Sequence, residues 1–150
     1  MQRNSPNQTN SIIFLYVISY ILYASLSSIY LFLPPLFSVL FVLFKKAIDE
    51  QDLKNLAIVS FCLVIYEANF DLILFSSIVY FSLLYKFLVP KIEQNISCKH
   101  CINFIYVFIS YFGFYLFMLL ISNIFLLNKP AIHYYVIFYI LIEFLIVSLL

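Results

Sequence analysis

Residues 33–55 read LPPLFSVLFVLFKKAIDEQDLKN, and this stretch contains the pattern that decides the fold. The proline pair Pro34 and Pro35 is followed by uncharged, mostly apolar residues as far as position 44, and then by six charged residues within positions 45–55. Proline lacks a backbone donor and disfavours a helical residue before it, so the pair marks a helix start. We therefore predict a helix over about 33–46, followed by a loop in water.

The composition of the whole chain agrees with this interpretation. Of the 150 residues 65% are hydrophobic and 10% are charged, which excludes an ordinary soluble domain. A formal net charge of +1 provides no basic surface for a nucleic acid, so no nucleic-acid partner is expected. A single glycine excludes glycine-rich phosphate loops, and the sequence contains no motif for a metal, a cofactor or an enzymatic nucleophile.

A helix needs about 20 apolar residues to cross roughly 30 Å of hydrocarbon. Residues 1–10 form a polar tail, and residues 11–150 are expected to form a single transmembrane helical domain. We predict an all-α integral membrane protein, a compact bundle of about six short helices. The expected helices are 11–27, 33–46, 56–69, 71–89, 102–127 and 131–150, with aqueous loops at 45–55 and 90–100.

The positive charges distinguish the possible topologies, because Lys and Arg accumulate in cytoplasmic loops. Six spans with cytoplasmic termini leave only Lys129 outside and place seven cations inside: Arg3, Lys45, Lys46, Lys54, Lys86, Lys91 and Lys99. Four spans would divide the cations four against four. The alternatives left open are a re-entrant first hairpin and five spans, the second if residues 1–27 are a cleaved signal peptide.

Three acidic residues are candidates for a functional site. Glu67 and Asp71 are four positions apart, so an uninterrupted helix would place both carboxylates on one face, where they could bind a cation or relay a proton. The other interpretation is that Asn69 opens a turn and the acids are solvated. Glu143 lies within an apolar helix and needs a buried partner, for which the candidates are a Tyr or Asn of a neighbouring helix, or Lys86. Its role is either a structural hydrogen bond between helices, made by a protonated Glu, or a part in transport.

Two smaller features carry weaker interpretations. Cys98, His100 and Cys101 have half the spacing of a structural zinc site, and no second pair exists in the chain to complete it. We therefore expect incidental thiols and no metal, and an interfacial position for His133. Ala24 and Ser28, four positions apart, would let helix backbones approach closely.

The layout resembles the rod shape-determining protein MreD family over nearly the whole chain. In that family the second helix follows a proline and the third ends on an aspartate; Pro35 matches the first feature, and Glu67 in LVIYE (63–67) stands at the second. The chain departs from the family near the acid, where Cys62, Ala68 and Asn69 stand in place of flanking glycines.

The resemblance implies a non-catalytic, multi-pass component of the bacterial inner membrane that takes part in cell-shape control and peptidoglycan elongation. Its implied partners are the lipid bilayer, an MreC-like scaffold, an actin-like filament protein, a transpeptidase and a polymerase. The alternative from another class is the substrate-binding membrane subunit of a small-molecule or vitamin importer. In that case Glu67, Asp71 and Glu143 would line a pocket.

Overall fold

The computed structural model describes the backbone of residues 6–126 and 134–149, and side chains from residue 17 onward within those ranges. The described residues form helices and short connections without a strand. The helices are α1 (Pro6–Ile29), α2 (Phe37–Asp49), α3 (Leu53–Asn69), α4 (Ser76–Leu83), α5 (Val89–Asn95), α6 (Lys99–Phe108), α7 (Phe114–Phe125) and α8 (Tyr135–Leu149). Two π-helical segments, η1 (Leu84–Leu88) and η2 (Ile109–Gly113), join α4 to α5 and α6 to α7.

Because η1 and η2 are continuous with their neighbours, the described chain consists of six helical rods, and the all-helical prediction is confirmed. Several boundaries differ from prediction: the loop expected at 45–55 shortens to 50–52, and the helix expected from 71 begins at Ser76. Helix α1 begins at Pro6, so half of the expected polar tail is helical. Helix α2 begins at Phe37, so the proline pair lies in the connection before the helix and does not open it.

The predicted loop at 90–100 was wrong, because the helix runs through Pro90 and ends at Asn95. A proline inside an α-helix removes one hydrogen bond and clashes with the carbonyl four residues earlier. Here the π-helical segment widens the preceding turn, and the Val89 amide bonds to the Leu84 carbonyl. The connection to α6 therefore shortens to 96–98.

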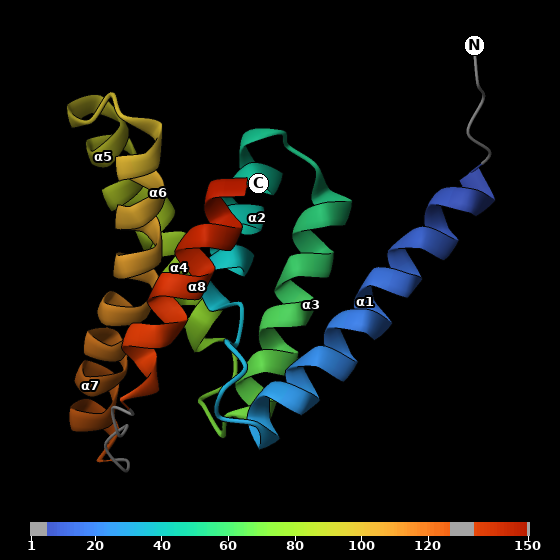
Figure 1. The fold of residues 1–150 in the computed structure, drawn as a ribbon, viewed down its shortest axis with the longest axis horizontal. Helices are drawn as coiled ribbons and strands as arrows, with labels where there is room; N and C mark the ends of the chain where they lie inside the picture. Colours follow the sequence, from blue (N-terminus) through green and yellow to red (C-terminus); the bar gives the residue numbers. More distant parts are fainter. Residues whose placement is uncertain (1–5, 127–133, 150) are drawn as a thin grey trace.

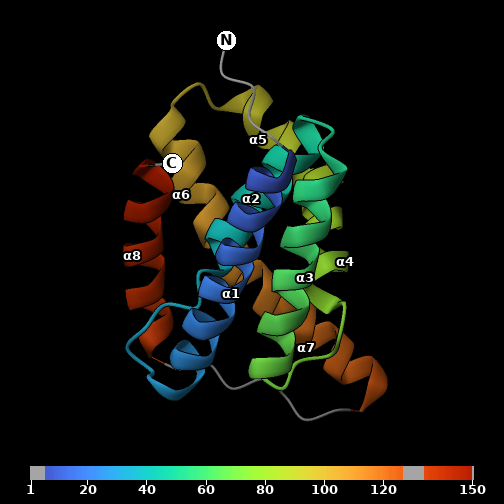
Figure 2. The ribbon, with the colours of Figure 1, turned by 90° about the vertical axis from the view of Figure 1, so that its right-hand side faces the viewer.

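Helix α2 is the centre of the bundle. It contacts α3, α6, η2 and α8, while α1 contacts α3. The core around α2 is aromatic: the rings of Phe37 and Phe81 lie 4.8 Å apart and those of Phe41 and Phe81 lie 5.1 Å apart. Figure 1 shows α1 running obliquely, close to α3 at one end and away from it at the other, and Figure 2 shows α1 crossing in front of α2.

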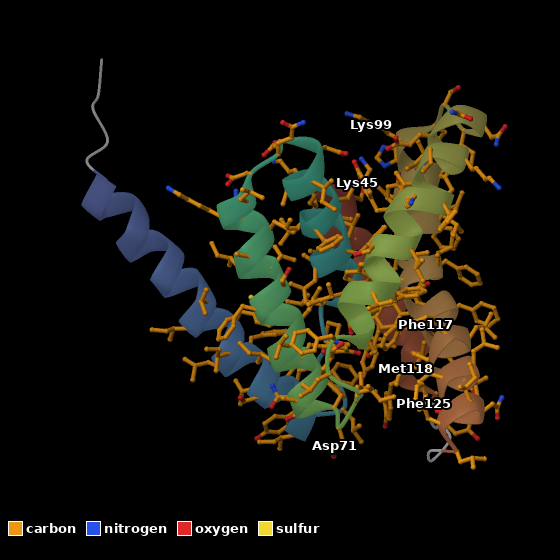
Figure 3. The ribbon with its side chains drawn as sticks, turned by 180° about the vertical axis from the view of Figure 1, so that it is seen from behind. Lys45, Asp71, Lys99, Phe117, Met118 and Phe125 are labelled. Atoms are coloured by element: carbon orange, nitrogen blue, oxygen red, sulfur yellow. The ribbon has the colours of Figure 1, made fainter. Side chains whose placement is uncertain are left out.

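The two ends of the bundle differ in charge. Lys45 and Lys99 lie at one end, which we call the lysine end, and Asp71 lies at the other (Figure 3). The start of α1 and the end of α8 lie on the side of the lysine end (Figures 1 and 2). The connections at the opposite end, 30–36 and 70–75, contain no Lys or Arg. Arg3 and Lys129 fall outside the described residues.

Large apolar side chains cover much of the outer surface, including Leu22, Phe87, Phe112, Ile124, Ile137 and Leu145. Buried positions hold polar side chains such as Ser38, Ser77, Ser110, Glu67 and Glu143. Within the described ranges one continuous helix, Lys99–Phe125, is long and apolar enough to cross a bilayer, and Val17–Ile29 and Tyr135–Leu149 are apolar but shorter.

Candidate functional site: two buried glutamates at helix N-termini

Helix α2 begins without a polar residue to cap it. Its N-cap position is Leu36, in the left-handed conformation with φ of 57°, and it provides no side-chain hydrogen bond. The first amides of a helix have no partner within the helix, and a buried amide without a partner is costly. A left-handed leucine costs a further 1–2 kcal/mol or so. Acceptors for these amides must therefore come from elsewhere in the fold.

Glu143 of α8 supplies them. Its side chain is completely buried, and its Oε1 and Oε2 accept the Phe37 amide at 3.1 Å and the Ser38 amide at 2.8 Å. The Ser38 hydroxyl donates to Oε2, and the Tyr111 hydroxyl donates to Oε1. A carboxylate accepts only, so four donors suit it. When ionised, the carboxylate also places a negative charge at the positive end of the α2 dipole.

The connection before α2 is held in the same way by hydroxyl groups of its neighbours. Tyr23 of α1 donates to the Pro34 carbonyl at 2.7 Å, and Ser27 donates to the Leu33 carbonyl at 3.0 Å. Tyr139 of α8 donates to the Leu31 carbonyl. The proline-containing connection is thus fixed from both α1 and α8, so α2 starts at a defined position.

Helix α4 repeats this arrangement with Glu67. Its N-cap position is Phe75, again left-handed with φ of 67° and without a side-chain cap. Glu67, completely buried in the last turn of α3, accepts the Phe75 amide at 2.6 Å, the Ser77 amide at 2.5 Å and the Ser76 hydroxyl at 3.1 Å. The two sites are neighbours, since the ring of Tyr66 stacks on that of Phe37 at 4.9 Å.

The shared-face interpretation of Glu67 and Asp71 is wrong. Helix α3 ends at Asn69, and Asp71 is exposed with φ of 51°. The Leu72 amide bonds to the Glu67 carbonyl at 3.0 Å across this residue, which is the six-to-one bond that closes a Schellman motif. Asp71 therefore ends α3 and is exposed, as the turn interpretation expected. The same interpretation was wrong for Glu67, which it expected to be solvated and which is completely buried.

The partner of Glu143 was predicted in part. Tyr111, in η2, is a tyrosine of a neighbouring helix, as expected. Lys86 is not the partner, because its side chain is exposed and its Nζ lies 5.9 Å from the centre of the Phe87 ring. The other donors to Glu143, which are Ser38 and the α2 amides, were not predicted. The available signal was a helix start with an apolar N-cap, which has to find its acceptors outside its own sequence.

The lysine end carries a polar network that the sequence analysis did not identify. Lys45 Nζ lies 2.7 Å from Asp49 Oδ2 and 3.1 Å from Glu93 Oε1, while Tyr85 donates to Asp49 and Tyr106 donates to Glu93. Burial opposes ionisation of Asp49, but hydrogen bonds from Lys45 and Tyr85 outweigh it and lower its pKa. Burial likewise opposes the charge on Lys45, and its two carboxylate partners raise its pKa.

Cys98 and Cys101 are exposed free thiols at the start of α6. A hydrogen bond from the Cys101 thiol lowers the pKa of Cys98. Across the described ranges no group of three His, Cys, Asp or Glu side chains could hold a metal ion. His133 lies outside the described residues.

Both buried carboxylates are held by hydrogen bonds from the fold. Each carboxylate oxygen already accepts at least one hydrogen bond, so the geometry suits holding helices in place. No protein-family model matches the chain, and neither a curated protein nor a solved structure matches it significantly.

Proposed function

We propose that this chain is a multi-pass protein of the bacterial inner membrane, with six spans and both termini in the cytoplasm. The support is the distribution of polarity: the outer surface is largely apolar, while serines and two glutamates are buried. Apolar surfaces of this extent are typical of contact with lipid or with other proteins. The lysine end would face the cytoplasm under the rule that cations stay inside.

The short rods require an adjustment of the bilayer in this proposal. At 1.5 Å per residue α2 and α8 extend about 20 and 22 Å, less than the roughly 30 Å of a typical hydrocarbon core. Helices of this length are accommodated by local thinning or by contacts with neighbouring proteins. A membrane complex would provide such contacts.

Within that membrane, the proposed role is a non-catalytic component of the cell-shape and wall-elongation machinery, as the resemblance to the MreD family implies. The observation that carries it is that Glu67 and Glu143 both accept hydrogen bonds from the amides at helix N-termini. Buried acids used in this way stabilise a framework. The partners would then bind to helix faces and to the two connections at the lysine end.

The importer alternative receives less support from the geometry. It requires Glu67, Asp71 and Glu143 to line a common pocket. The two glutamates point at different helix N-termini, and Asp71 is exposed outside both sites. Neither the cavity between α1, α2 and α3 nor the one beside Lys45 and Glu93 is lined by any of the three.

Topology is tested with reporter fusions placed after Gln51 and after Gln94. Gln51 lies in the connection between α2 and α3 and Gln94 lies in α5, so both reporters should be cytoplasmic. Reporters on opposite sides of the membrane would refute the six-span arrangement.

The role is tested by depleting the protein in its native host and measuring cell width. Rounding or swelling is the expected result, and it should be rescued by the wild-type chain. Normal shape at full depletion would reject the role, and binding of small molecules by the purified protein would then be the next measurement.

A further inference from the structure

A crevice separates α1 from α2 and α3 and is not part of the glutamate sites. Its walls are apolar: Val17 and Tyr20 from α1, five residues from α2 and its N-cap, and Ile58, Val59 and Cys62 from α3. These five are the N-cap Leu36 and Val39, Leu40, Leu43 and Ala47 of α2, spaced as one face of a helix.

The crevice has a polar rim at one end only. Lys46, Glu50 and Asn55 line it where α2 ends and α3 begins, at the lysine end. The Lys46 and Glu50 side chains are exposed and lie 4.0 Å apart, a loose pair that leaves both charges available. The site is therefore amphipathic, with an apolar channel that opens at a cation and an anion side by side.

The shape of the crevice fits an extended hydrocarbon chain. From Leu36 to Glu50 its lining extends about 21 Å at 1.5 Å per residue. The volume is about 460 Å³. A volume of this size spread over that length makes the crevice narrow, so a long and thin occupant suits it.

We propose that the crevice binds one phospholipid with a phosphoethanolamine headgroup. This inference rests on the proposed membrane location and is independent of the role in cell shape. An acyl chain would lie along α2, the lipid phosphate would pair with Lys46, and the primary ammonium would donate to Glu50 and the Asn55 amide oxygen. The rim thus places a cation beside the phosphate of the headgroup and an anion beside its ammonium group.

The same rim discriminates between headgroups. A primary ammonium donates three hydrogen bonds, as a lysine does, whereas the quaternary ammonium of choline has no N–H to donate. An anionic glycerol headgroup would place no cation opposite Glu50. A charge-assisted hydrogen bond is stronger than a neutral one, and the loss of one should weaken binding by about tenfold.

The test uses the full chain, extracted from membranes and delipidated in detergent, with lipid binding followed by native mass spectrometry. Phosphatidylethanolamine, phosphatidylcholine and phosphatidylglycerol with identical acyl chains are titrated separately. We expect one tightly bound phosphatidylethanolamine, with about tenfold weaker binding of the choline lipid. Glu50→Gln should reduce this preference to near unity while leaving a bound lipid.

Leu43→Trp fills the crevice and should abolish the tightly bound lipid. Its matched control is Leu120→Trp, on an exposed position of α7 that does not line the crevice. Equal binding of the three lipids, preference for phosphatidylglycerol, or equal lipid retention in the two tryptophan variants would overturn the proposal. Failure of the chain to stay with alkali-washed membranes would instead reject the proposed membrane location, before any lipid is added.

Discussion

The Glu143 cap predicts the outcome of a near-isosteric substitution, Glu143→Gln. The amide retains one acceptor oxygen, which replaces either Oε1 or Oε2, and presents an NH₂ group at the other position. In either orientation the nearby hydroxyl, from Tyr111 or Ser38, can rotate to accept from the NH₂. The backbone amide on that side, from Phe37 or Ser38, cannot, so one buried N–H loses its acceptor.

A buried donor without an acceptor costs about 1–3 kcal/mol. For a chain of this size each kcal/mol lowers the melting temperature by about 2–4 °C, so Glu143→Gln should lower it by roughly 2–12 °C. The matched control is Glu50→Gln, the same change at an exposed side chain, expected to lie within about 0.5 kcal/mol of the parent.

The assay follows the loss of the helical circular-dichroism signal on heating, because the described ranges are almost entirely helical. Equal melting temperatures for Glu143→Gln and Glu50→Gln in delipidated protein would refute the assignment of Glu143 as the α2 cap.

A second pair of variants tests the same cap from the donor side. Tyr111→Phe removes the hydroxyl that donates to Glu143, and should destabilise the protein by about 0.5–1.5 kcal/mol, the net contribution of a typical hydrogen bond. Tyr20→Phe removes a buried hydroxyl that has no hydrogen-bond partner among the described residues, and should be neutral or stabilising. The reverse order would contradict the hydrogen-bond assignment.

Three further predictions use the same unfolding assay. Glu67→Ala should destabilise the chain by about 3–5 kcal/mol, because three donors lose a buried acceptor, while Asp71→Ala at the exposed turn should cost less; the same order is expected for rescue of cell shape. Because the pKa of Asp49 is lowered in the folded protein, ionised Asp49 stabilises the fold at neutral pH. This stabilisation is lost as the pH falls below 3.8, the ordinary pKa of an aspartate, so the stability difference between wild type and Asp49→Asn should shrink in acid. Gly113→Ala places a Cβ 2.1 Å from the oxygen of the Tyr80 hydroxyl, which donates to the Ile109 carbonyl. The substitution should therefore destabilise the wild-type chain and be nearly neutral in a Tyr80→Phe background. Equal losses of stability in both backgrounds would disprove the clash.

Much of the helical layout was predictable because apolar runs and their interruptions are local signals. The turn after Asn69 and the exposure of Asp71 followed from polar residues in an apolar run. The continuation of the helix through Pro90 was not predictable, because no local sequence rule indicates a π-helical turn that absorbs a proline. Helix α3 shows what sequence can predict about caps: Asp52 accepts from the Lys54 and Asn55 amides within its own first turn.

The starts of α2 and α4 lack that local signal, because their caps come from glutamates of other helices. The candidate site could therefore be predicted only in part. Glu67 caps a helix whose N-cap, Phe75, lies eight positions later across a short connection, whereas Glu143 is separated from Ser38 by 105 positions. An acid in an apolar helix can be identified from sequence as a residue that needs a partner. An apolar residue such as Leu36 at a helix start can be identified as a cap that is missing. Only the packing of α8 against α2 brings this acid to the uncapped helix start. Glu143→Gln tests whether the resulting cap stabilises the bundle.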